Sequence, residues 1–386
     1  MSFGLSLPPH HRVFAAFALH ALAMGSIFPR LPEIQRDLGV SEGTLGLALI
    51  GVPVGCLASL TFATPLLERL GFRHVLLAAI PLVALTFAIA VQAANPVALF
   101  ALLVPAGALI GCVEIVVNVE ADRTEALIGR RIMNRAHAFW SMGFFAAGLF
   151  GAAMGHIGIS PQLHLALIVP IAAAAVALFL GKYTAAPLRA ATETQASSKL
   201  ARPTFAIMLL VGVTLSAMLM EGAGMDWSAI YMHKLFAAGP FLAGSAVATI
   251  ALSQGLCRYF ADGFVEAQSP VLVARVLLSM LAVGLLCLVA AASPGLSMLG
   301  FALLGAGTSA IFPLAMSAAA QRTDRPASIN VAALAQISFV AFLFGPPLLG
   351  FVAQHWGIQW AYGIGLPFVA LSFWTSSALQ PESASK

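Results

Sequence analysis

Residues 12–28 read RVFAAFALHALAMGSIF, a run in which only Arg12 and His20 carry ionisable side chains. A stretch of about 20 apolar residues crosses the hydrocarbon core of a bilayer as an α-helix. Similar runs recur along the whole chain, which is 60% hydrophobic and only 9% Asp, Glu, Lys and Arg. The core of a water-soluble protein has no use for so many apolar and so few charged residues, so the sequence predicts an integral membrane protein with the lipid bilayer as its solvent.

Apolar windows of about 19 residues predict twelve transmembrane helices. The first six are expected at 12–29, 44–67, 74–93, 97–120, 137–155 and 163–183. The last six are expected at 204–227, 241–261, 271–292, 297–318, 330–353 and 360–379. The polar, basic and small-residue-rich segment 185–203 separates the two sets. The sequence therefore predicts an all-α membrane protein built from two six-helix bundles, 1–184 and 204–386, joined by a flexible linker.

Lysine and arginine gather in every second gap between the apolar runs. The remaining gaps hold only Arg30, Arg36 and Lys234. Cytoplasmic loops of membrane proteins are enriched in Lys and Arg, so we expect both termini and the linker to lie in the cytoplasm. The net charge of +4 then needs no nucleic-acid partner to explain it.

Glycine stripes occupy matching positions in the two halves. The eleventh span carries the run GPPLLG at 345–350, and the fifth span carries Gly143, Gly148, Gly151 and Gly155. Glycines let helix backbones approach closely, and paired prolines bend a helix. Because both stripes fall at the same ordinal position in their half, we interpret the chain as an internal duplication.

Glu114 is the most informative ionisable residue. It lies deep in the expected fourth span, with Asn118 one helical turn further on the same face. An ionisable side chain at membrane depth costs roughly 3 kcal/mol on insertion scales, which makes it a functional candidate by default. Burial favours the neutral form of a carboxyl group and so allows proton exchange near neutral pH. Glu114 is predicted to couple transport to protons; the alternative is a structural acid hydrogen-bonded to a neighbouring helix.

The seventh span contains the sequence MEGAGMDWS, in which Glu221 and Asp226 lie near the expected outer end of the helix. Gly222 and Gly224 are expected to loosen the helix there. A broken helix beside two acids suits a proton-coupling or gating role for Glu221 and a ligand contact for Asp226 and Trp227. Asp226 and Trp227 also fit an anchor pair at the membrane interface.

Other polar residues inside the expected spans are weaker candidates. His20 lies midway along the first span, where an imidazole relays protons, donates to a ligand or simply packs. Gln336 and Gln254 are polar groups that could face a solute, although their spacing specifies no ligand. Arg258 and Asp262 are expected near the cytoplasmic edge of the eighth span, where a long side chain can snorkel to water.

The segment after the second span reads PLLERLGFR, from Pro65 to Arg73. This acid–Arg–x–Gly–x–Arg run resembles the signature of the major facilitator superfamily between spans two and three. Two positions differ, since Thr64 replaces a usual glycine and Phe72 a usual arginine. The resemblance implies a conformational latch between the bundles, and we assign to it Glu68, Arg69, Gly71 and Arg73, with Arg258 and Asp262 as the degraded second copy.

Glu114 and Asn118, followed by Asn-x-Ala-x-x-Phe-x-Ser-x-Gly from residue 134, resemble the fucose/glucose/galactose proton symporter branch of this superfamily. In that branch the span-four glutamate couples protons, and two amide side chains of span five bind sugar hydroxyls. Here those two positions are His137 and Trp140. Trp140 can still stack on a sugar face. His137 also fits a histidine at the cytoplasmic start of the helix.

The superfamily resemblance implies that spans one, four, seven and ten surround one central cavity, which would bring His20, Glu114 and Glu221 together. The sequence MEGAGMDWS also resembles a signature of uncharacterised, sugar-permease-like proteins of the bacterial inner membrane, and this resemblance implies the same location. The chain shows no phosphate loop, nucleotide fingerprint, metal-ligand pair or nucleophile elbow. We therefore expect neither an enzyme nor a cofactor, with the proton gradient as the energy source.

We predict a monomeric secondary carrier that takes up a small polar, sugar-like solute with protons by alternating access. One alternative is proton-coupled efflux of amphipathic or cationic compounds, which Trp140 and the two acids would suit. The efflux branches carry a central Gly-Pro in span five, whereas the segment from Gly148 to Gly151 has no proline. Another alternative, a membrane sensor or scaffold, would be expected to carry a sizeable soluble domain.

Overall fold

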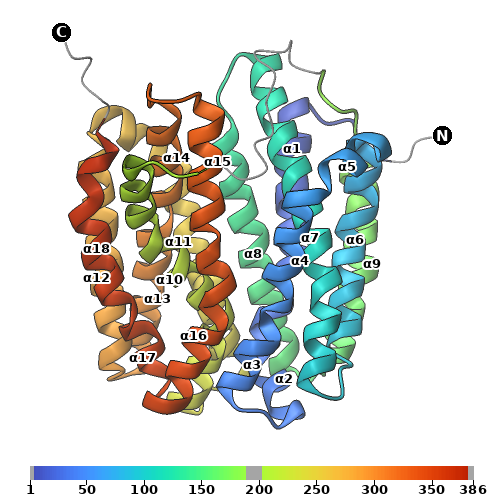
Figure 1. The fold of residues 1–386 in the computed structure, drawn as a ribbon. Helices are drawn as coiled ribbons and strands as arrows, with labels where there is room; N and C mark the ends of the chain where they lie inside the picture. The colour runs from blue at the N-terminus through green and yellow to red at the C-terminus, as the bar shows by residue number, and fades with distance from the viewer. Residues whose placement is uncertain (1–3, 188–201, 381–386) are drawn as a thin grey trace.

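The computed structural model describes residues 4–187 and 202–380, which form helices joined by short turns, with no strand among them (Figure 1). The first half contains α1 (Pro9–Gly25), η1 (Phe28–Arg30), α2 (Leu31–Leu38), α3 (Glu42–Leu49), α4 (Gly51–Phe62), α5 (Thr64–Leu70), α6 (Phe72–Ala90), α7 (Pro96–Ile128), α8 (Met133–His156) and α9 (Pro161–Leu180). The second half contains α10 (Phe205–Phe236), α11 (Pro240–Ala267), α12 (Pro270–Ala290), α13 (Pro294–Thr308), α14 (Ile311–Ala320), α15 (Ala327–Ser338), α16 (Val340–Trp356), α17 (Ile358–Gly363), α18 (Gly365–Thr375) and η2 (Ser376–Leu379).

Several long helices start where the sequence offers a capping side chain followed by proline. Asn95, Ser160, Ser269 and Ser293 each precede a proline, and each accepts a hydrogen bond from the backbone N–H three residues further on, at 2.9–3.2 Å. The cap satisfies one of the free N–H groups of the first turn, and proline needs no N–H partner at that position. Local chemistry therefore fixes the starts of α7, α9, α12 and α13.

Twelve segments of the described residues are long and apolar enough to cross a membrane, which confirms the predicted number. The fourth and seventh segments extend further than predicted, to Ile128 and Phe236. Hydropathy predicts only the part of a helix that lies in the hydrocarbon core, whereas the hydrogen-bonded helix can continue beyond the membrane. The predicted break at Gly222 and Gly224 is wrong, because α10 is continuous, and Glu221 lies at its middle rather than near its outer end.

The tenth span is interrupted at Ser309 and Ala310, between α13 and α14. Pro313 follows four residues after Ser309 and has no N–H, so the Ser309 carbonyl lacks its usual helical donor. That carbonyl instead accepts a hydrogen bond from Nε of Arg258 in α11, at 3.0 Å. The proline thus creates an acceptor inside the second half.

The two halves form two six-helix bundles that meet along two pairs of helices (Figure 1). In the α8–α11 pair, a Cβ on Gly148 would lie 3.0 Å from the backbone nitrogen of Ala248. In the α3–α16 pair, Gly350 of the second stripe packs against the backbone carbonyl of Glu42, and Gly46 packs against that of Pro346. The glycine stripes therefore serve close backbone approach, as the sequence predicted, and part of that approach joins the two halves.

The start of α1 and the end of η2 lie at the same end of the molecule, which we call the terminal end, opposite the far end (Figure 1). At the far end Lys234 of α10 pairs with Glu42 of α3. The Gly43 N–H there donates to Oε1 of Gln354 in α16, at 3.1 Å. Toward the terminal end, α4 continues from α3 but makes little contact with α16. Contact between these two helix faces is thus confined to the far end.

The long helix α7 is fastened to the segment that follows α9. The hydroxyl group of Tyr183 donates a hydrogen bond to the buried carboxylate of Glu120, and the Ala186 backbone N–H donates to the same Oε2 atom at 3.0 Å. Burial and the Glu120 charge raise the pKa of Tyr183, so the phenol keeps its proton. The beginning of the connection to the second half is therefore held against α7.

A Gly107→Ala substitution in α7 tests the packing that closes the first half. Its Cβ would collide with the backbone carbonyl of Val52 in α4, and overpacking of this kind costs roughly 1–3 kcal/mol. Gly295→Ala is the control, since nothing lies within 4 Å of its Cβ. We expect a lower melting temperature in detergent for Gly107→Ala only. Equal melting temperatures would contradict the close α4–α7 contact.

Candidate functional site

The wall contributed by the first half centres on Glu114 of α7. Its Oε1 lies 3.2 Å from Nε2 of His20 in α1, and its Oε2 accepts a hydrogen bond from Nδ2 of Asn118 at 3.1 Å. The Glu114 side chain is 28% exposed, whereas His20 is completely buried. The predicted spacing of Glu114 and Asn118 on one helix face is confirmed. The structure also joins His20 to them, so a carboxyl group and an imidazole share one hydrogen bond.

His137 lies in the first turns of α8, next to this cluster. Its ring meets Phe17 of α1 edge to face, with centroids 5.0 Å apart. The charges of both Arg258 and Glu114 act on the imidazole. His137 therefore lies near both the acid of the first half and the arginine of the second half.

The wall contributed by the second half is an ion pair with three further polar neighbours. Nη2 of Arg258 donates to Oε1 of Glu221 at 3.2 Å, and Nε2 of Gln254 donates to the same oxygen at 2.9 Å. Gln254 also approaches the hydroxyl group of Thr308 at 3.5 Å. The expected snorkelling of Arg258 is wrong: its side chain is only 12% exposed, because Glu221 and the Ser309 carbonyl attract it inward.

A hydrogen bond between described residues joins the two walls at this depth. Nη1 of Arg258 donates to Oγ of Ser141 in α8 at 3.2 Å, and the Ser141 hydroxyl in turn approaches the His137 carbonyl at 3.3 Å. Gly255, one turn before Arg258, makes the approach possible, because a Cβ there would lie 2.9 Å from Cβ of Ser141. The sequence motif contained Ser141, but nothing in its spacing indicated a bond across the halves.

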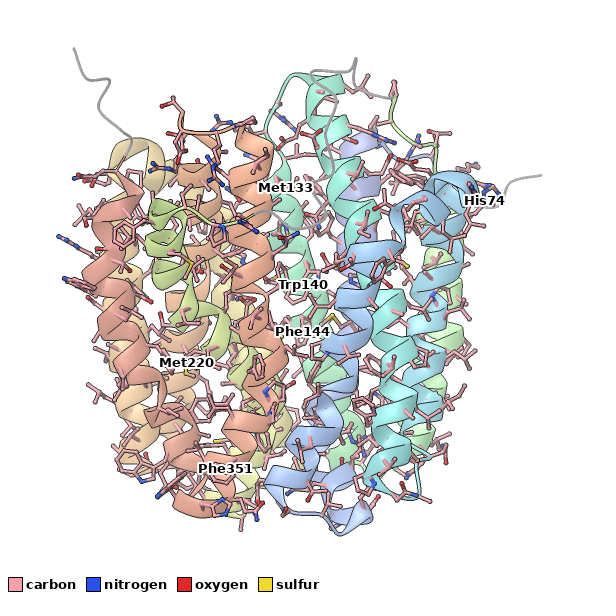
Figure 2. All side chains as sticks on the ribbon, in the orientation of Figure 1. His74, Met133, Trp140, Phe144, Met220 and Phe351 are labelled. Atoms are coloured by element: carbon pink, nitrogen blue, oxygen red, sulfur yellow. The ribbon has the colours of Figure 1, made fainter. Side chains whose placement is uncertain are left out.

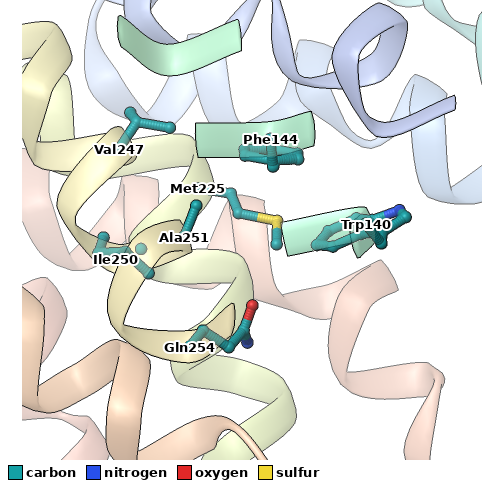
Figure 3. A pocket seen from close by; sticks show the side chains of 8 residues that line it. Trp140, Phe144, Met225, Val247, Ile250, Ala251 and Gln254 are labelled. Atoms are coloured by element: carbon teal, nitrogen blue, oxygen red, sulfur yellow. The ribbon is translucent and has the colours of Figure 1, made fainter. Parts of the chain in front are cut away.

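A small, mainly apolar pocket lies between α8 and the second half (Figure 3). Its lining consists of Trp140, Phe144, Gly224, Met225, Val247, Ile250, Ala251 and Gln254. Trp140 and Phe144 stack with centroids 5.1 Å apart, and Figure 2 places both near mid-height between the halves. Among the described residues, nothing accepts a hydrogen bond from Nε1 of Trp140. The pocket thus offers aromatic surface, and in Figure 3 the indole nitrogen of Trp140 points away from the other lining side chains.

Asp226 and Trp227 lie apart from this network. Trp227 is completely buried, and its ring approaches Gly350 of α16, so it is no interface anchor. Asp226 is half-buried, and no hydrogen bond or ion pair connects it to another described residue. Gln336 is exposed on α15 and makes no hydrogen bond with the described residues. The structure therefore does not bring these three predicted ligand residues to the Glu114 and Glu221 clusters.

The expected latch is well formed locally. Gly71 adopts a positive φ of 77° after α5, where glycine is favoured, and Nη2 of Arg73 donates to the Gly181 carbonyl at 2.8 Å, within the first half. Glu68 and Arg69 are exposed. Asp262 belongs to α11, but its side chain lies outside the described part of the structure. The role of these residues stays a prediction.

Sequence reasoning missed the ion pair between Glu42 and Lys234. Glu42 is buried at the first turn of α3, next to Gly43, and Lys234 lies in the part of α10 that the predicted span left out. Lys234 was one of only three Lys or Arg residues in the gaps predicted to lie on the external side of the membrane. This rarity was the signal that could have marked it as a residue with a partner. Among the described residues, no group of three or more His, Cys, Asp or Glu side chains could hold a metal ion.

The sequence profile of the Major Facilitator Superfamily matches residues 13–262. An uncharacterised MFS-type transporter of Yersinia pestis is 28% identical over 354 residues, which cover 90% of each chain. Among solved structures, a variant of the nucleoside transporter NupG aligns with a TM-score of 0.73 at 14% identity, covering 97% of this chain and 100% of that one. The E. coli fucose:proton symporter FucP aligns at 0.61 and 18% identity, covering 96% and 98%. With well over half of its length matched by the family profile, the chain belongs to the Major Facilitator Superfamily.

Proposed function

We propose that this multi-pass membrane transporter takes up a small polar solute together with protons. The observation that supports this most is the cluster of Glu114, His20 and Asn118, a partly exposed carboxyl group at mid-depth whose hydrogen-bond partners are an imidazole and an amide. Neither partner carries a permanent charge. The cluster can therefore hold Glu114 either ionised or protonated without leaving a fixed charge unpaired.

The proton step that we assign to Glu114 needs no cofactor. The ionised carboxylate accepts hydrogen bonds from Asn118 and from a protonated ring nitrogen of His20. When Nδ1 of His20 takes up a proton and the Nε2 proton passes to Glu114, the carboxyl group donates back to Nε2 at the same distance, 3.2 Å. The hydrogen bond to His20 reverses direction while the heavy atoms keep their places, and Asn118 continues to donate. Such a site gains and loses a proton with little rearrangement.

We further propose that the molecule lies in a bacterial inner membrane with its terminal end in the cytoplasm. The excess of Lys and Arg in the gaps on that side supports this orientation. The relative in Yersinia pestis is bacterial. The far-end contacts would then close the external side, and α4 and α16, which make little contact, would open toward the cytoplasm. Uptake requires a second state in which the far end opens.

The two bundles, with boundaries proposed at 184 and 204, would rock about the site as a monomer. In the second state the far-end contacts break, and the segment from Glu68 to Arg73 latches the cytoplasmic side. The solute would meet the Trp140 ring on one wall and the amide of Gln254 on the other. FucP is a fucose:proton symporter and NupG a nucleoside transporter, so sugars and nucleosides are the first candidates.

Efflux of an amphipathic cation is the second candidate. The aromatic pocket of Trp140, Phe144 and Met225 favours it, because aromatic faces attract cations. The two candidates predict opposite effects of the solute on proton movement. In uptake the solute and the proton enter together, whereas in efflux each inward proton accompanies outward solute.

Glu114→Gln tests the proton site. A thermal-shift screen of sugars, sugar acids, nucleosides and lipophilic cations first identifies a ligand, since binding to the folded state raises its melting temperature. In proteoliposomes, we expect Glu114→Gln to abolish ligand-dependent proton movement and to retain ligand exchange, because glutamine keeps the shape but carries no exchangeable carboxyl proton.

Asp37→Asn is the control for that experiment. Asp37 pairs with exposed Arg36 away from the site, so proton movement should match that of the wild type. Proton movement that persists in Glu114→Gln would remove Glu114 from the mechanism.

Lys234→Met tests the closed far end. Breaking the pair leaves buried Glu42 without its cation, and a shift of about 1 kcal/mol changes the ratio of closed to open molecules about fivefold. We expect a maleimide that cannot cross the membrane to label Ile50→Cys, in a background lacking native cysteines, about fivefold faster. Lys234→Arg should label at the original rate. An unchanged rate in Lys234→Met would show that the pair does not hold this end closed.

A further inference from the structure

The guanidinium group of Arg258 contacts more helices than any other side chain described above. It donates to Glu221 of α10, to the Ser309 carbonyl between α13 and α14, and to Ser141 of α8, at 3.0–3.2 Å. Its own helix, α11, supplies the fourth element. Arg258 therefore ties three helical segments of the second half to one helix of the first half.

The carboxylate of Glu221 is built as an acceptor. Its Oε1 receives two hydrogen bonds, one from Arg258 at 3.2 Å and one from Gln254 at 2.9 Å. Both side chains of the ion pair are 12% exposed. Arginine stays charged at any pH that a cell meets, so the positive charge beside Glu221 is permanent. A proton on Glu221 would leave that charge without its counter-ion in a low dielectric.

Glu114 has a different environment. Its hydrogen-bond partners are His20 and Asn118, and no Lys or Arg of the described residues forms an ion pair with it. The titratable groups near the ion pair are His137 of α8, on which both Arg258 and Glu114 act, and Asp226 on α10 itself. Asp226 lies five residues after Glu221 and so faces another direction. The two glutamates thus differ in whether a permanently charged cation is paired with the carboxyl group, which decides whether that group can bind a proton.

We propose that Arg258 is a positioning residue that keeps Glu221 permanently ionised, so that of the two glutamates only Glu114 exchanges a proton. The proposal rests on the proposed proton-coupled function and narrows it. Glu221 becomes a fixed part of the second wall that orients Arg258 toward Ser141. The site then alternates between one excess negative charge and none, which suits an uncharged polar solute travelling with one proton.

Infrared difference spectroscopy of the reconstituted full chain, switched between about pH 5.5 and pH 8.5, tests this without a solute. Protonated and ionised carboxyl groups absorb at different infrared frequencies, so a carboxyl group that titrates between these two pH values gives a difference band. Compared with the wild-type protein, we expect the Glu114→Gln variant to lose intensity in this difference band and the Glu221→Gln variant to lose none. Arg258→Gln should add one carboxyl band per molecule, because Glu221 becomes able to bind a proton.

The double variant Glu221→Gln/Arg258→Gln should lose that added band and melt at a higher temperature than either single variant, since neither charge is stranded. Arg258→Lys keeps a cation beside Glu221 and should show no added band. This variant provides the test if Arg258→Gln does not fold. Loss of band intensity in Glu221→Gln alone would overturn the proposal, as would the absence of an added band in folded Arg258→Gln. Unchanged intensity in Glu114→Gln would instead contradict the proposed function.

Discussion

The cost of an unpaired charge in hydrocarbon governs the interior of this transporter. Three acids at membrane depth or at the closed end have three kinds of partner: Glu221 has a guanidinium group, Glu42 an ammonium group and Glu114 an imidazole. A guanidinium group never releases its proton, whereas an imidazole does so near neutral pH. In our proposal it is therefore the partner, more than the acid itself, that makes Glu221 a fixed part of the wall, Glu42 a closing contact and Glu114 the site of proton exchange.

Glycine decides where those partners can meet. Gly255 lets α8 come close enough for Arg258 to reach Ser141, and Gly46 lets α3 rest on α16 at the end where Glu42 meets Lys234. In a bilayer the lipid tails are as apolar as leucine, so helices associate through close van der Waals packing and a few polar contacts. The glycines and the charged side chains thus act at the same contacts. The glycines bring the helix backbones together, and the charged side chains make each contact depend on electrostatics.

The sequence predicted much of this architecture because hydropathy and charge bias act over whole segments. Twelve spans, the glycine contacts and the pairing of Glu114 with Asn118 all follow from local spacing. The Arg258–Glu221 pair did not, because it joins residues 37 positions apart on helices whose rotation is set by packing. The apparent edge position of Arg258 was misleading for the same reason: its side chain is held inward by Glu221 and the Ser309 carbonyl, partners outside α11 that spacing along the helix does not reveal.

The fastening of Tyr183 and Ala186 to Glu120 gives the connection between the halves a mechanical meaning. Glu120 lies six residues after Glu114 on the same rigid helix, so the beginning of the inter-bundle tether and the proposed proton site move as one body. A pull on that tether, whether by a bound protein or by a shortened loop, would act on α7 directly. The start of the connection between the halves is thus mechanically coupled to the Glu114 carboxyl group through α7.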